Sequence, residues 1–237
     1  MDFYGFYTGK IFDAYKYLGA HVEEKGVTFR TFAPSASRIT LIGEFNDWQE
    51  WEMNKVSDGN FWECYVPQAK AGQMYKYKIY DRNSNPVDHC DPYGFGMELR
   101  PSSASIIRDM SKYKFKDSQW LQSRSDCRKK PLNIYEIHFG SFRKPSDKAD
   151  DWYNYEEMID ILIPYLVKNG YNYLEIMPLN EYPCDESWGY QATGFFSPTS
   201  RYGTTDQLKA FIDACHKHNI GVLMDFVPVH FLSLIHI

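Results

Sequence analysis

Between residues 131 and 225 the chain alternates strand-like and helix-like segments, and this alternation constrains the fold more than any other feature. Apolar runs occupy Leu132–Phe139, Tyr171–Met177 and Ile220–Asp225. Two segments with apolar residues at helical spacing, 154–170 and 204–215, lie between them. Strand–helix–strand units place consecutive strands side by side, so the pattern predicts a parallel sheet covered by helices.

Helix-start signals support both helical segments. Asn154 followed by Glu157, and Thr204 followed by Gln207, have the spacing of capping boxes. Pro164 lies inside the first segment, where we expect a kink. One apolar face follows each start: Met158, Ile161, Leu162 and Tyr165 in the first helix, and Leu208, Phe211, Ile212 and Cys215 in the second. The stretch 178–203 shows no clear element.

The preceding part of the chain contains short, β-branched and aromatic runs separated by turn signals. We expect strands at Val27–Phe32, Arg38–Gly43, Phe61–Val66 and Met74–Asp81. Strands at this spacing predict an antiparallel sandwich. The predicted organisation is a lead segment at 1–19, a β-sandwich at 20–105, a polar connection at 106–130 and an α/β part at 131–237.

Composition narrows the function classes. A net charge of −5 argues against nucleic acid or an anionic membrane as the main partner. The apolar C-terminal stretch contains Asp225 and Pro228, so we expect no membrane span. The N-terminal segment lacks the apolar run of a signal peptide. Five scattered cysteines without a CxxC predict reduced thiols in the cytoplasm and no zinc site. Aromatic residues make up 17%, which suits either a tyrosine-rich core or stacking on sugars.

Several motifs, in order, resemble those of glycogen (1,4-α-glucan) branching enzymes. They are YLGAH at Tyr17–His21 with the segment Thr31–Trp48, YEIHFGSF at Tyr135–Phe142, LEIMPLNEYP and SWGYQATG within Leu174–Gly203, and DFVPVHF at Asp225–Phe231. The resemblance implies an immunoglobulin-like sandwich of carbohydrate-binding module 48, followed by the (β/α)8 TIM barrel of glycoside hydrolase family 13. Such a barrel needs roughly 250 residues. The 107 residues from Pro131 onward would supply only its first three strands, which predicts an N-terminal fragment.

Related enzymes with the same plan remain alternatives. Debranching enzymes and trehalose-releasing hydrolases share the sandwich and barrel. Two features favour a branching enzyme. Val229 stands where most of the superfamily has Asn before the motif histidine, and the WGYQxTG string also fits branching enzymes better. A non-catalytic glucan-binding protein, complete at 237 residues, is the alternative from another class.

The chemistry implied by the resemblance needs two carboxyl groups that this chain does not supply. Retaining transfer requires a carboxylate nucleophile and a carboxylic acid/base. In the family these groups, and a third Asp, follow barrel strands four, five and seven, beyond the chain end, so we assign no catalytic residue and expect the chain alone to be inactive. Glu136 and Glu175 are read as structural or inward-facing charges, and Asp185 and Glu186 as a loop turn or the cleft rim. No cofactor or metal is expected.

Four substrate-binding residues follow from the resemblance. Tyr190 matches a tyrosine that stacks on the sugar next to the cleaved bond. Asp225 and His230 match the polar residues of the DFVPVHF motif, where the histidine contacts a sugar hydroxyl. Gln191 is a further candidate for the same cleft. The expected partner is an α-glucan, either glycogen or a linear 1,4-glucan.

Two residues of the sandwich match glucan-contacting positions of its family. Trp48 and Lys76 are these candidates, although the second tryptophan expected near residues 85–91 is absent and Trp48 is equally compatible with structural packing. The tail 232–237 departs from the family and reads as non-native sequence. We further expect aggregation or disorder after about residue 130, with the sandwich able to fold alone, because three barrel strands leave an unpaired edge and uncovered apolar faces.

Overall fold

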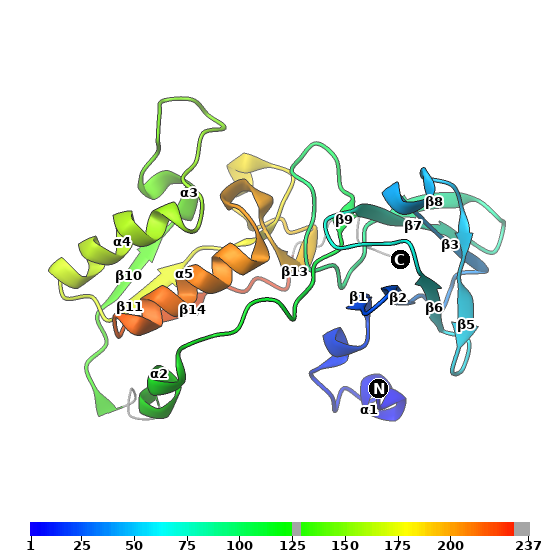
Figure 1. Cartoon of the computed structure of the whole chain (residues 1–237), viewed down its shortest axis with the longest axis horizontal. Helices are drawn as coiled ribbons and strands as arrows, with labels where there is room; N and C mark the ends of the chain where they lie inside the picture. The colour runs from blue at the N-terminus through cyan, green and yellow to red at the C-terminus, as the bar shows by residue number, and fades with distance from the viewer. Residues whose placement is uncertain (125–128, 230–237) are drawn as a thin grey trace. The chain divides into compact units, whose positions relative to one another are not determined.

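The computed structural model describes residues 1–124 and 129–229, which form two compact units. The first unit contains Met1–Asp109 together with Thr193–Ser197. The second contains Met110–Ala192 and, among the described residues, 198–229. Figure 1 shows the first unit as mostly strands and the second as strands with helices.

The first unit is a sandwich of two antiparallel sheets. One has the order β1 (Gly19–Glu23), β2 (Gly26–Phe32), β6 (Phe61–Val66), β5 (Asn54–Val56). The other has the order β4 (Trp51–Glu52), β3 (Arg38–Gly43), β7 (Met74–Tyr80), β8 (Pro86–His89), with β9 (Ser105–Ile106) also paired to β7. The core between them includes fully buried Phe29, Leu41, Tyr75 and Tyr77. The predicted sandwich is confirmed.

The N-terminal segment packs on this sandwich through aromatic rings. It contains α1 (Phe3–Tyr7) and a single helical turn at Ala14–Lys16. The Phe3 ring lies 4.8 Å from that of Phe61, and the Phe6 ring lies 5.1 Å from that of Phe32. Edge-to-face contacts of this kind hold one side of α1 against the sandwich, and the helix is too short to be stable alone.

The second unit is built on a parallel sheet of three strands, as the sequence predicts. The strand order is β10 (Ile134–Ile137), β11 (Tyr173–Ile176), β14 (Gly221–Met224). The helices α4 (Glu157–Lys168) and α5 (Thr205–Lys217) connect these strands and share their apolar core. Two shorter helices, α2 (Ser118–Ser123) and α3 (Phe139–Phe142), precede and follow β10. This is the arrangement of the first strands of a (β/α)8 barrel.

The predicted helix starts are present as reciprocal hydrogen bonds. The Gln207 N–H donates to Thr204 Oγ1 at 3.3 Å, and the Thr204 N–H donates to Gln207 Oε1 at 2.8 Å. Asn154 and Glu157 exchange the same pair of bonds, at 2.9 and 2.8 Å. Helix α4 continues through Pro164 without interruption.

The segment 178–203 corrects the prediction of no clear element. It contains β12 (Asn180–Glu181), a helical turn at Asp185–Ser187, β13 (Gly194–Pro198) and a second turn at Ser200–Tyr202. These pieces are too short to produce a periodic pattern. They are stabilised by polar side chains within the segment, which sequence periodicity does not detect.

Apolar side chains lie exposed on and beside the parallel sheet. On the outer strands, Ile134 is 40% exposed and Met224 49% exposed. Beyond β14, Phe226 is 64% exposed. Exposed apolar side chains at strand edges favour association. Aggregation after residue 130 remains a prediction.

Candidate functional site

The parallel register sorts the strand residues into two faces. Glu136 on β10 is paired with Glu175 on β11, which is paired with Leu223 on β14. Because successive side chains alternate between faces, these three share the face opposite the buried Leu174 and Ile176. His138, Met177 and Asp225 continue the same face at the carboxyl ends of the strands, where (β/α)8 enzymes carry their active sites.

Tyr190 and Asp225 meet at these strand ends. The Tyr190 hydroxyl donates a hydrogen bond of 2.9 Å to Asp225 Oδ2. This bond raises the pKa of Tyr190, and burial and the charges of Asp225, Glu136 and Glu175 raise it further. The phenol therefore stays protonated at neutral pH and remains a donor. Two residues 35 positions apart, expected separately from the sequence, thus form one site.

The structure says less about Gln191 and His230, the other two substrate-binding candidates. Gln191 follows Tyr190 and is exposed. His230 and the tail 232–237 lie outside the described residues.

Sequence reasoning missed an aromatic pair beside Tyr190. The Trp188 and His138 rings stack with centroids 5.5 Å apart and planes 23° apart. His138 Nδ1 lies 2.9 Å from Ser141 Oγ, whereas His138 Nε2 is buried and has no partner among the described residues. Burial lowers the pKa of His138, and the positive charge of Arg201 lowers it further, so the imidazole is neutral at pH 7. Both residues occur in motifs of the sequence, but only the folded loop brings them together.

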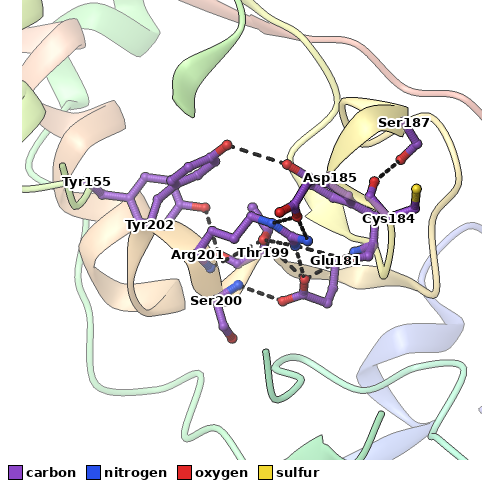
Figure 2. A network of polar contacts seen from close by, with 10 residues as sticks. Tyr155, Glu181, Cys184, Asp185, Ser187, Thr199, Ser200, Arg201 and Tyr202 are labelled. Atoms are coloured by element: carbon purple, nitrogen blue, oxygen red, sulfur yellow. Dashed lines mark hydrogen bonds and ion pairs between the residues drawn. The ribbon is translucent and has the colours of Figure 1, made fainter. Parts of the chain in front are cut away.

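A buried ion-pair network holds the loop that carries Trp188 and Tyr190 (Figure 2). Arg201 Nη1 donates to Glu181 Oε1 at 2.8 Å and to the Tyr182 carbonyl at 2.9 Å. Arg201 Nε donates to Asp185 Oδ1 at 3.0 Å. The guanidinium also lies 3.7 Å from the centre of the Tyr182 ring. The Ser200 N–H completes the network with a bond of 2.6 Å to Glu181 Oε2.

A backbone hydrogen bond and close packing connect this network to the aromatic residues of the loop. The Trp188 N–H donates to the Asp185 carbonyl at 3.1 Å. Gly189 has φ +92° and packs so closely that an added Cβ would lie 2.3 Å from the Pro178 carbonyl oxygen. Asp185 is therefore held in place by Arg201. Glu186 is exposed and accepts a bond from Cys184 Sγ at 3.0 Å.

In the first unit, Trp48 and Lys76 lie near the same end of two neighbouring strands. Trp48 is 41% exposed and has φ +58°. Its N–H donates to the Gly43 carbonyl at 2.8 Å. Lys76 is half-buried and is paired with Ile42, which precedes Gly43. Exposure of Trp48 in a left-handed conformation is unusual for a purely structural tryptophan.

Two protein families match the two halves of the chain. Residues 17–94 match "Carbohydrate-binding module 48 (Isoamylase N-terminal domain)". Residues 158–234 match "Alpha amylase, catalytic domain". The chain is therefore similar, in two separate segments, to a carbohydrate-binding module 48 and to an α-amylase catalytic domain.

The chain is also similar to curated 1,4-α-glucan branching enzymes. It is 42% identical to the enzyme of Fusobacterium nucleatum subsp. nucleatum over 98% of its length, and 44% identical to that of Dechloromonas aromatica over 96%. It spans 38% and 37% of those relatives' lengths. The sequence-based recognition of this family is confirmed.

A solved structure supports the fold. A crystal structure from Salmonella typhimurium, described as that of a candidate alpha amylase, superposes with a TM-score of 0.70 and 25% identity. The match covers 92% of this chain and 35% of that one. Among the helices of the described residues, none is long and apolar enough to cross a membrane.

Proposed function

We propose that the protein containing this chain is a 1,4-α-glucan branching enzyme. It cleaves an α-1,4 bond of glycogen or a linear glucan and transfers the freed chain to a 6-hydroxyl. The observation that carries the proposal is the Tyr190–Asp225 hydrogen bond at the carboxyl ends of parallel strands, in a chain 42% identical to a branching enzyme. Tyr190 presents a ring to the sugar, and Asp225 fixes that ring through its hydroxyl.

The residues of this chain bind and orient the glucan but do not cleave it. Retaining transfer needs a nucleophilic carboxylate and an acid/base about 5 Å apart. We assign both to barrel strands that follow the three in this chain, so the chain alone is inactive. His230 and Gln191 supply hydrogen bonds to sugar hydroxyls at the same cleft. The negative charges of Glu136 and Glu175 raise the pKa of the Tyr190 phenol further, after the larger effects of the Asp225 bond and of burial.

The sandwich unit contributes a second contact to the same polymer. Trp48 supplies an exposed aromatic face, and Lys76 supplies a hydrogen-bond donor on the neighbouring strand. We expect Trp48→Ala to weaken glycogen binding, whereas a short linear-glucan oligomer should be turned over normally. Equal losses for long and short glucans would contradict a separate role for this unit.

Cytoplasmic location is part of the proposal. The cysteines at 64, 90, 184 and 215 are free thiols, which suits a reducing compartment. We propose no nucleic-acid or membrane partner, because the net charge is −5.

The decisive test is product analysis with the full-length protein. Incubation with a linear α-1,4-glucan should create α-1,6 linkages, counted by proton NMR, without increasing reducing ends. An increase in reducing ends without new branches would instead indicate a debranching or other hydrolase. Binding without either product would indicate a non-catalytic glucan-binding protein.

A further inference from the structure

Trp188 is a large aromatic residue that is held rigidly and yet left exposed beside Tyr190. Its side chain is 53% exposed, and its backbone has φ +55°. Bulky residues rarely adopt this left-handed conformation, so the surroundings must enforce it. The Arg201–Asp185 contact and the close packing of Gly189 on either side do so. Such strain persists preferentially at ligand sites.

His138 supports one face of the Trp188 ring. Its imidazole stacks on the indole with planes 23° apart, so the exposed area of Trp188 lies on the other face and the edge. His138 Nε2 is buried and has no hydrogen-bond partner among the described residues. The left-handed tryptophan and the histidine thus meet in one contact at the ends of the parallel strands.

We propose that Trp188, supported by His138, is a second aromatic contact for an α-1,4-linked glucose unit, next to the one bound by Tyr190. This rests on the proposed function. A pyranose ring presents C–H groups on its faces, which pack on an indole face, while its hydroxyls need polar partners at the ring edge. Trp188 provides the face, and the carboxylate of Asp225 lies at the same strand ends. Trp188 is a binding residue, and His138 is a positioning residue that acts through it.

The experiment compares substitutions at both positions in the full-length protein. Trp188→Leu should raise the KM for linear glucan about 2- to 12-fold, with kcat nearly unchanged, which corresponds to about 0.5–1.5 kcal/mol at 1.4 kcal/mol per tenfold. Trp188→Phe keeps a ring and should lose less. His138→Phe retains a flat support and should restore the KM that His138→Ala raises. Phe12→Leu, which alters an aromatic residue 91% exposed in the first unit, is the matched control and should change nothing.

A binding measurement separates this inference from the proposed function. Maltoheptaose should change the tryptophan fluorescence of the wild-type protein, and the change should shrink in Trp188→Leu as affinity falls by the same factor. If the wild-type protein binds maltoheptaose but forms no branches, the proposed function fails and the contact is judged by affinity alone. If Trp188→Leu keeps the wild-type KM, affinity and fluorescence response, the inference is overturned. A KM raised equally by His138→Phe and His138→Ala would overturn the supporting role of His138.

Discussion

Replacing Arg201 with methionine should destabilise the second unit strongly, because it removes the cation that is paired with the buried Glu181 carboxylate. The side chains of Arg201 and Glu181 are 1% and 3% exposed, and they are joined by a bond of 2.8 Å. After the substitution, the Glu181 carboxylate loses the Arg201 cation and keeps its bonds to the Ser200 and Tyr182 N–H groups and to the Thr199 hydroxyl. Breaking a buried pair in this way costs about 3–5 kcal/mol.

The loss of stability caused by Arg201→Met should be larger at neutral pH than at acidic pH. Burial already raises the pKa of Glu181 above its ordinary value, and Arg201 opposes that rise. Arg201→Met should raise it further. A carboxyl group whose pKa is higher in the folded state than in the unfolded state makes the protein less stable as pH rises from the unfolded-state pKa through the folded-state pKa. The difference between variant and wild type should therefore be largest at pH 7 and should shrink as pH falls toward about 4.

Urea unfolding of the full-length protein, followed by tryptophan fluorescence at pH 7 and pH 4.5, measures this effect. With a slope of roughly 2–3 kcal/mol/M, the midpoint at pH 7 should fall by about 1–2.5 M. The double variant Arg201→Met with Glu181→Leu removes both charges and should recover much of the loss. A loss under about 1 kcal/mol, or one of equal size at both pH values, would refute this explanation.

Three further changes test individual contacts. Tyr190→Phe keeps the ring but loses the hydrogen bond to Asp225, so kcat/KM for branching should fall roughly 10- to 150-fold, since a bond to a charged group contributes about 1.5–3 kcal/mol; an unchanged value would count against this pairing. Thr204→Ala removes the cap of α5 that bonds to Gln207, and urea unfolding should show a loss of about 1 kcal/mol, whereas no loss would mean that packing alone fixes the helix start. Burial raises the pKa of Asp91 to about 6, so the wild-type sandwich should lose stability as pH rises from about 4 to 6. Asp91→Asn should remove that slope in urea titrations, and a slope that persists would assign it to another group.

The parallel sheet and its helices could be predicted because their signals are local and repeated. The helix-capping boxes that begin at Asn154 and Thr204 can be recognised in the sequence, and both form the expected hydrogen bonds. The sequence analysis did not predict five strands of the sandwich, and apart from β1 these are short or irregular. Strands β4 and β9 have two residues each, and β8 begins at Pro86, a residue that favours a turn.

The residues of the candidate site also differ in whether the sequence could predict them. Tyr190 and Asp225 lie in recognisable motifs, so the sequence could identify both through the resemblance. The Arg201 network could not be predicted, because arginine is rarely buried and its partners lie 16 and 20 residues away. The Trp188–His138 contact joins a loop to a strand end and depends on how that network folds the loop. Long-range polar packing of this kind leaves no periodic trace in a single sequence.

The central claim is that the protein containing this chain makes α-1,6 branches through a cleft that includes Tyr190 and Asp225. The most direct measurement is the number of α-1,6 linkages formed per reducing end released by the full-length protein acting on a linear α-1,4-glucan. We expect many new branches with no net gain in reducing ends, and a large loss of branching in Tyr190→Ala. Reducing ends that accumulate without branches, or branching that is unaffected by Tyr190→Ala, would contradict the claim.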